Sequence, residues 1–204
     1  MTRPPVQGFT RSYLSEVAQI LQQLDGAIID KAVDMLADVR DRGGRLFILG
    51  VGGGAANAAH AVNDFRKLAE IEAYSPTDNV AELTARINDE GWPGSFEAWL
   101  RVSRIGANDL ILVFSVGGGD LARNISPNLV RALEYARTIG VRILGIVGRE
   151  AGFTAGVADA CIVVPCVNRQ HVTPHTEACQ AVLWHLMVSH PRLKRAPTKW
   201  ESTA

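Results

Sequence analysis

The sequence lacks net charge, because its 204 residues contain 21 Lys and Arg against 21 Asp and Glu. A neutral chain has no long-range field that draws in nucleic acid or an anionic membrane, so we expect neither as a partner. Cysteine is scarce as well: the three thiols, Cys161, Cys166 and Cys179, are odd in number and show no CxxC spacing. This usage argues against a disulfide framework and favours a reducing compartment.

Long apolar runs are also missing. No stretch approaches the length of a membrane span, and the first eight residues (MTRPPVQG) lack the basic segment and apolar run of a secretion signal. We therefore expect a cytoplasmic protein without a membrane segment. The length fits one domain with a single substantial core, and no linker or repeat divides the chain, so 1–204 is treated as one domain.

Glycine, in contrast, is abundant, and two runs of it follow apolar stretches. One run comes directly after the segment 45–50 and the other soon after the segment 110–115. Strand, glycine loop and helix together offer bare backbone N–H groups and a helix N-terminus to an anion. Two copies predict a phosphorylated small molecule as ligand, bound where the strands end. The glycines concerned are Gly52, Gly53, Gly54, Gly117, Gly118 and Gly119.

Apolar segments alternate with helical patterns along most of the chain, and the segments are apolar throughout. This is typical of a parallel sheet covered on both faces. The expected strands are 45–50, 110–115, 142–147, 161–165 and, more weakly, 71–75. The expected helices are 55–70, two short ones within 78–104, 127–139 and 175–189. The sequence thus predicts an α/β fold with a doubly wound, five-stranded parallel sheet of flavodoxin-like type, whose ligands bind at the carboxyl ends of the strands.

Residues 10–42 carry apolar side chains at helical spacing ahead of the first strand, which predicts a long extra helix. This helix either packs across the sheet or forms a subunit interface, and the pattern favours neither. After the α/β core at about 45–190, the tail 191–204 contains several basic residues. We expect the tail to be loosely attached and solvated, or to contact a partner subunit.

Two pairs of titratable residues stand on shared helix faces. His60 and Asp64 are four residues apart in the helix after the first glycine run, and Glu177 and His185 are eight apart in the last helix. An i,i+4 pair alone is more often a surface hydrogen bond or a packed histidine than a site. Together, the four make a plausible site for a divalent ion such as zinc, or the acid and base of a proton transfer.

Other polar residues are weaker candidates. His171 and His175 flank a proline and are expected to be exposed in a loop or a helix start. Ser126, followed by proline, has the signature of a helix N-cap, and such a serine can also give its hydroxyl to a phosphate. Ser115 ends the strand below the second glycine run.

The order of these motifs resembles the sugar isomerase (SIS) domain and, within it, the phosphoheptose (sedoheptulose 7-phosphate) isomerase family. The resemblance spans nearly the whole chain. The matching segments are the first glycine loop with the helix of His60, 77–78 with 88–92, the Ser115 loop with 126–128, and the last helix with His185.

In that family one helix carries a histidine and, four residues on, a glutamate base. A glutamine lies eight residues before an acid histidine in the last helix. By this resemblance His60 and His185 match directly, while Asp64 stands in place of the glutamate and Glu177 in place of the glutamine. Because these positions bind metal in some members, the resemblance implies a divalent metal, zinc, held by the same four residues.

The resemblance also implies a phosphate site. The family's serine contacts to phosphate map onto Ser115 and Ser126, and Asp78 lies in a matching segment. The first loop differs from the usual pattern, since Val51 and Gly54 stand where the family has asparagine and serine. Backbone N–H groups of the glycine runs would then contribute much of the contact with the phosphate.

The activity implied is interconversion of sedoheptulose 7-phosphate and a heptose 7-phosphate by a homo-oligomer, most often a tetramer. Asp64 would move a proton between C1 and C2 through an enediol, with His185 as the acid and Glu177 as the alternative base. The runner-up interpretation is a non-catalytic SIS protein that binds a sugar phosphate as a sensor or scaffold. Because the fold hosts both, the retained carboxylate and imidazole are what favour an enzyme.

Overall fold

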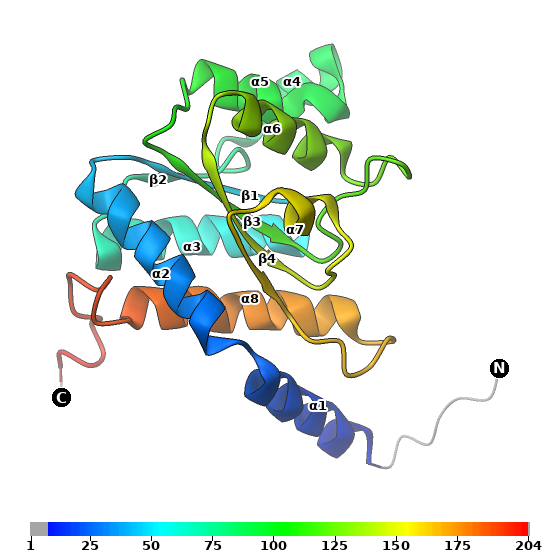
Figure 1. Ribbon diagram of the computed structural model, residues 1–204, viewed down its shortest axis with the longest axis vertical. Helices are drawn as coiled ribbons and strands as arrows, with labels where there is room; N and C mark the ends of the chain where they lie inside the picture. The colour runs from blue at the N-terminus through cyan, green and yellow to red at the C-terminus, as the bar shows by residue number, and fades with distance from the viewer. Residues whose placement is uncertain (1–7, 204) are drawn as a thin grey trace.

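A parallel sheet of five strands lies at the centre of the computed structural model, which describes residues 8–203 (Figure 1). The strands are β1 (Leu46–Gly50), β2 (Ala73–Tyr74), β3 (Leu110–Ser115), β4 (Arg142–Val147) and β5 (Ala160–Val163), in the spatial order β2-β1-β3-β4-β5. The chain first steps outward from β1 to β2 and then returns to β3 on the other side of β1. The carboxyl ends of β1 and β3 therefore flank the switch point at which such sheets bind ligands.

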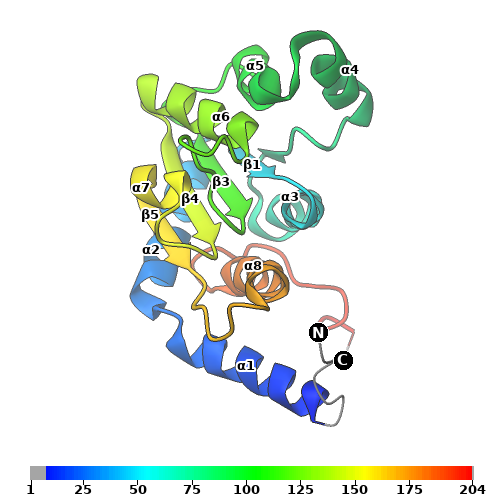
Figure 2. The same cartoon turned by 90° about the vertical axis from the view of Figure 1, so that its right-hand side faces the viewer.

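Helices cover both faces of this sheet (Figure 2). Strand side chains alternate between two apolar clusters: Ile48 and Leu112 face one set of helices, and Leu49 and Val113 face the other. The first set is α2 (Gly26–Asp41), α3 (Gly53–Ala69) and α8 (Val172–Ser189). The second set is α5 (Ser95–Val102) and α6 (Pro127–Thr138), with α4 (Val80–Glu90) and the 3₁₀ turn Trp92–Gly94 beside them.

The predicted α/β fold is thus confirmed. β3 and β4 have the expected bounds, and the segment 78–104 forms two short helices as expected. β2 is only two residues long. The five-residue helix α7 (Phe153–Val157) was not predicted, because it is too short to show an apolar period.

The N-terminal segment, expected as one long helix, forms two: α1 (Phe9–Gln23) and α2. Leu24 takes an extended backbone with ψ of 135°, and the Asp25 carboxylate accepts a hydrogen bond from the Ala27 N–H at 2.9 Å. Aspartate is a strong helix N-cap, so α2 starts here although the apolar period continues through the break. The two helices can then point in different directions.

These two helices differ in how they meet the body of the protein. α2 packs against the sheet beside β5 and buries seven residues, whereas Ile20 is the one buried residue of α1. Packing across the sheet therefore describes α2, while α1 projects from the edge of the molecule near α8 (Figures 1 and 2).

The first part of the tail is anchored, so the expected loose attachment is wrong there. Leu193 is fully buried, and the N–H groups of Arg195 and Ala196 donate to the Leu68 carbonyl at 2.7 and 3.1 Å. These contacts fix the chain to the end of α3. Among residues 8–203, no helix combines the length and the apolar character that crossing a membrane requires.

Candidate active site

The two glycine loops lie side by side because β1 and β3 are neighbours in the sheet. After β1, Gly52 takes a positive φ of 60° and α3 begins at Gly53. A Cβ on Gly53 would lie 2.4 Å from the Cδ of Glu177, and one on Gly54 would lie 2.4 Å from the Phe114 carbonyl oxygen. The first loop is glycine-rich because the start of α3 approaches both α8 and β3 too closely for a side chain.

The second loop folds back on its own serine. The Gly118 N–H donates to the Ser115 Oγ at 3.0 Å, and Gly119 continues the turn with φ of 79°. Residues 120–125, which follow the second glycine run, close as a small hairpin, since Asp120 and Ile125 exchange two backbone hydrogen bonds of 3.0 Å. The Ser115 hydroxyl accepts one bond within the loop and keeps its own proton for a further acceptor.

A cavity of about 190 Å³ lies where these loops meet α6 and α8. Its walls include Gly54 and Gly117 from the loops, the hydroxyl-bearing Ser115 and Ser126, and Glu177 from α8. The strand ends and the N-terminus of α6 converge there, which is the setting that the sequence predicted for an anion.

Ser126 stands at the N-cap position of α6, but its side chain forms no capping hydrogen bond. Its backbone is left-handed, with φ of 50° and ψ of 53°, a conformation that non-glycine residues seldom adopt. The expectation that its hydroxyl caps α6 is therefore wrong. The residue lines the cavity instead, in a strained backbone conformation of a kind that clusters at ligand-binding sites.

A carboxylate between two imidazoles lies farther along α3 and α8, which pack side by side (Figure 2). The Oδ2 atom of Asp64 is 3.4 Å from His60 Nε2 and 3.3 Å from His185 Nε2. The indole N–H of Trp184 donates to the same oxygen at 3.1 Å, and Asn63 donates to Oδ1 at 3.0 Å. Asp64 is buried while both imidazoles are about half exposed, so the cluster opens to solvent through its histidines.

Glu177 lies apart from this cluster. It shares a face of α8 with His185, but eight residues correspond to roughly 12 Å of helix rise. Ligand atoms of His60, Asp64 and His185 all lie within 4.8 Å of one another, whereas the Glu177 carboxylate sits against Gly53 in the cavity. Three of the four residues expected to bind a metal come together in this chain.

Asp78 lies in the loop after β2, where its carboxylate accepts a hydrogen bond from the Ser75 N–H at 2.9 Å. It does not line the cavity between the glycine loops. Its carboxylate holds the turn that leads into α4.

Two amides that the sequence reasoning missed connect the cavity to the helices. Gln180 is fully buried and lines the cavity; its Nε2 donates to the Ile146 carbonyl at 3.2 Å. Asn57 donates to Gln180 Oε1 at 2.9 Å and to the Glu177 carbonyl at 3.0 Å. In the sequence, Gln180 could have been recognised as a polar residue about one turn after Glu177 in a mostly apolar helix. These bonds fix α8 against α3 and so position Glu177.

Comparisons with known proteins agree with this architecture. The family model of the SIS domain matches residues 12–148, more than half of the chain. A phosphoheptose isomerase of Geotalea daltonii is 30% identical over 165 residues, which cover 78% of this chain and 80% of the relative. This chain belongs to the phosphoheptose isomerase family of SIS-domain proteins. A second family member, from Chlorobium phaeobacteroides, is 29% identical over 184 residues, covering 86% of this chain and 76% of the relative.

Solved structures show the same fold. Phosphoheptose isomerase GmhA of Neisseria gonorrhoeae superposes with a TM-score of 0.78 at 22% identity, covering 90% of this chain and 97% of that one. The sugar isomerase domain of the RpiR transcription factor of Sphaerobacter thermophilus gives a TM-score of 0.60 at 21% identity, covering 92% and 89%. The architecture of the phosphoheptose isomerase family thus also occurs in a domain of a protein named as a transcription factor.

Proposed function

We propose that this chain is a sugar-phosphate isomerase that interconverts sedoheptulose 7-phosphate and a heptose 7-phosphate. Membership in the phosphoheptose isomerase family supports the substrate class. The observation that carries the activity is a buried carboxylate, Asp64, in contact with the imidazole of His185 on the helix that also borders the glycine-loop cavity. A base beside an acid is what proton transfer between neighbouring carbons requires.

In this proposal the substrate phosphate binds in the cavity, where Gly54 and Gly117 bring the backbone of the two glycine loops to the wall. Ser115 and Ser126 add hydroxyl groups, and the N-terminus of α6 adds its dipole. Gly53 and His60 are separated by seven residues of α3, or roughly 10 Å of rise. The carbon chain of the sugar spans this distance, and binding of the phosphate places the far end of the sugar against the cluster.

Asp64 takes a proton from C1 or C2 of the sugar and returns it to the neighbouring carbon, which passes the substrate through an enediol. His185 gives a proton to the oxygen on one of these two carbons and takes a proton from the oxygen on the other. Glu177 is the alternative base, but its place in the cavity wall puts it beside the phosphate and away from the C1–C2 end of the sugar in this arrangement. Replacing each carboxylate by its amide and following solvent-deuterium uptake at C2 separates the two: the true base is the one whose amide variant loses exchange.

The residues of the cluster fit a divalent metal. Two imidazole nitrogens and one carboxylate oxygen within 4.8 Å of one another are a donor set that zinc accepts, and Trp184 orients the carboxylate. His60, Asp64 and His185 would hold the ion, and Asp64 and His185 would then be less free to act as base and acid, so the two roles compete. When bound, a zinc ion supplies Lewis-acid polarisation of the substrate carbonyl. Glu177 joins this set only if its side chain turns away from Gly53.

The proposed assembly is a homo-oligomer, namely a tetramer. The proposed location is the cytoplasm. Large apolar side chains are exposed on α1 (Phe9, Leu14) and on α8 (Val182, Leu186), which supports contacts between subunits. The three free cysteines, none of them in a disulfide, support a reducing compartment. Analytical ultracentrifugation at micromolar concentration is expected to give a tetramer; a monomer would contradict the assembly.

The second candidate function is a sensor that binds the sugar phosphate without turning it over. The fold alone does not exclude this alternative, because the sugar isomerase domain of a transcription factor shares it. Assaying purified protein against a panel of ketose phosphates, with and without chelator, decides between the two. Turnover of sedoheptulose 7-phosphate supports the isomerase, whereas tight binding without turnover of any ketose phosphate supports the sensor.

A further inference from the structure

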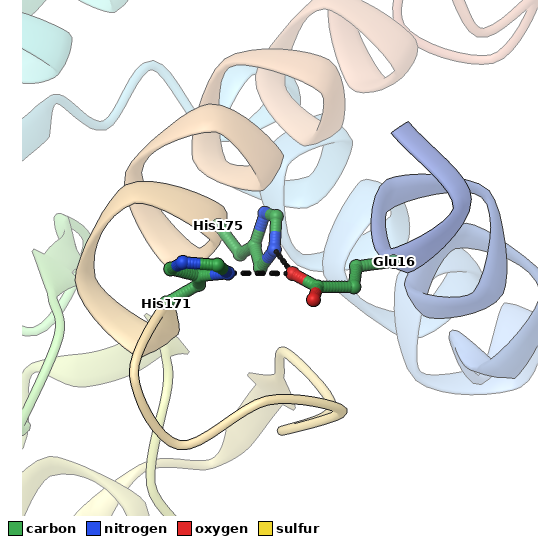
Figure 3. A group of neighbouring side chains, drawn as sticks. All are labelled: Glu16, His171 and His175. Atoms are coloured by element: carbon green, nitrogen blue, oxygen red, sulfur yellow. Dashed lines mark hydrogen bonds and ion pairs between the residues drawn. The ribbon is translucent and has the colours of Figure 1, made fainter. Parts of the chain in front are cut away.

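A second carboxylate–histidine cluster lies at the other end of α8 (Figure 3). Glu16 of α1 reaches two histidines at the start of α8: its Oε2 is 2.7 Å from His171 Nδ1 and 2.7 Å from His175 Nε2. The expected exposure of these histidines is wrong for His175, which is only 2% exposed. Segments about 155 residues apart in sequence therefore meet through polar atoms.

The cluster is preorganised around Glu16. Its second oxygen accepts a hydrogen bond from Asn168 Nδ2 at 2.7 Å, and the Tyr13 ring lies 4.5 Å from the His175 ring. Three polar side chains therefore surround the Glu16 carboxylate: His171, His175 and Asn168. Among the described residues, the buried Nδ1 atom of His175 has no hydrogen-bond partner. The contact between His175 Nε2 and Glu16 therefore determines the orientation of the ring.

We propose that Glu16, His171 and His175 form a second divalent-cation site, for zinc, which fastens α1 to α8. The three ligand atoms lie within 4.8 Å of one another. Two histidines four residues apart with a carboxylate from another segment are a donor set that zinc uses in proteins. This proposal is independent of the isomerase activity.

The geometry needs a small adjustment to admit the ion. Ligands at about 2.05 Å in a tetrahedron lie about 3.4 Å apart, so the two 2.7 Å contacts would open by roughly 0.6 Å. Each neutral imidazole would carry its proton on the nitrogen that does not bind: Nε2 in His171 and Nδ1 in His175. Glu16 and His171 are partly exposed, so a water molecule could reach the ion as a fourth ligand.

The position of α1 gives such a site a structural purpose. Apart from Ile20, α1 buries no residue, so little apolar contact holds it to the body. A bound ion at Glu16 would link α1 directly to the first turn of α8. Metal ligation commonly supplies the stability that a small apolar interface cannot.

The test counts zinc sites in the full chain after removal of metal with a chelator. His60→Ala/His185→Ala removes the imidazoles of the active-site cluster, and competition with a chromogenic zinc indicator then reports the remaining site. We expect this double variant to bind one equivalent of zinc. Adding Glu16→Gln keeps the side-chain shape but removes the carboxylate, and zinc binding should weaken by on the order of a hundredfold. Loss of a residue that only hydrogen-bonds to a metal ligand already costs about 10- to 100-fold in affinity.

Glu150→Gln in the same background is the matched control, because Glu150 is an exposed carboxylate outside both clusters, and zinc affinity should not change. Cobalt substitution gives a second readout: visible ligand-field bands without a thiolate charge-transfer band are expected, and Glu16→Gln should abolish them. Circular dichroism confirms that each variant is folded. Absence of zinc binding in the His60→Ala/His185→Ala variant, or binding unchanged by Glu16→Gln, would overturn the proposal and leave a hydrogen-bonded cluster only.

Discussion

The two clusters along α8 use the same chemistry, one carboxylate and two imidazoles, in opposite surroundings. In the cluster of His60, Asp64 and His185, the candidate active site, the two imidazole side chains are 56% and 50% exposed. In the α1 cluster the corresponding values are 21% for His171 and 3% for His175. An exposed imidazole can meet a substrate, whereas a buried one can only meet its protein partners or an ion.

Their partner helices explain the difference. The first cluster joins α8 to α3, a long helix that is already packed against the sheet, so its polar groups are not needed to hold the fold. The second joins α8 to α1, which has little else to attach it. We therefore expect similar side chains to serve chemistry in the first cluster and attachment in the second.

The largest expected effect is on catalysis. His185→Ala or Asp64→Asn should reduce isomerisation roughly a hundredfold or more, the usual size of an acid–base contribution, with the fold intact. Glu16→Gln should leave turnover at the wild-type level, because Glu16 belongs to the α1 cluster. Steady-state kinetics with sedoheptulose 7-phosphate, alongside circular dichroism, checks both statements.

Two results would contradict this assignment. Retained turnover in both the His185→Ala and the Asp64→Asn variants would show that these residues are not the acid–base pair. Glu177 would then be the candidate base. A large loss in Glu16→Gln would mean that the α1 cluster also takes part in catalysis, and the contrast between the clusters would fail.

A smaller effect is expected at the cavity that lies between the clusters. Loss of one hydrogen bond to a charged phosphate costs roughly 1.5–3 kcal/mol, so Ser126→Ala should weaken sugar-phosphate binding about tenfold or more. Because the Ser126 side chain makes no capping bond, stability should hardly change. Titration calorimetry with the sugar phosphate and its dephosphorylated analogue is the measurement. Equal weakening for both ligands would show that the loops are turns and not a phosphate site.

The sequence predicted the sheet well because its strands are buried on both faces and therefore apolar throughout. β3 and β4 match their predicted bounds. The glycine run that includes Gly53 and Gly54 lies just after the carboxyl end of β1, as predicted. The helix break at Asp25 was missed because helical periodicity continues through it. Patterns of apolar residues report burial, and they do not report where a helix axis changes direction.

The candidate site was predictable in part, for a related reason. His60 and Asp64 lie one turn apart in a single helix, so their contact follows from local spacing. Glu177 and His185 share one face of α8, but the distance between them also depends on the rise along the helix axis. Eight residues of rise keep the two side chains apart. Glu16 could not be linked to His175 at all, because only the tertiary packing of α1 brings them together.

The smallest expected effect is a difference in stability between the two clusters, measured with chelator present so that no ion contributes. His175→Ala removes a buried ring and leaves the Glu16 carboxylate short of a donor, which should lower the free energy of unfolding by about 1–3 kcal/mol. His60→Ala removes a half-exposed ring and should change it by no more than about 0.5 kcal/mol. Urea unfolding followed by circular dichroism gives both values under one set of conditions. If His60→Ala destabilises the protein as much as His175→Ala does, exposure of the imidazoles does not separate a chemical role from an attaching one.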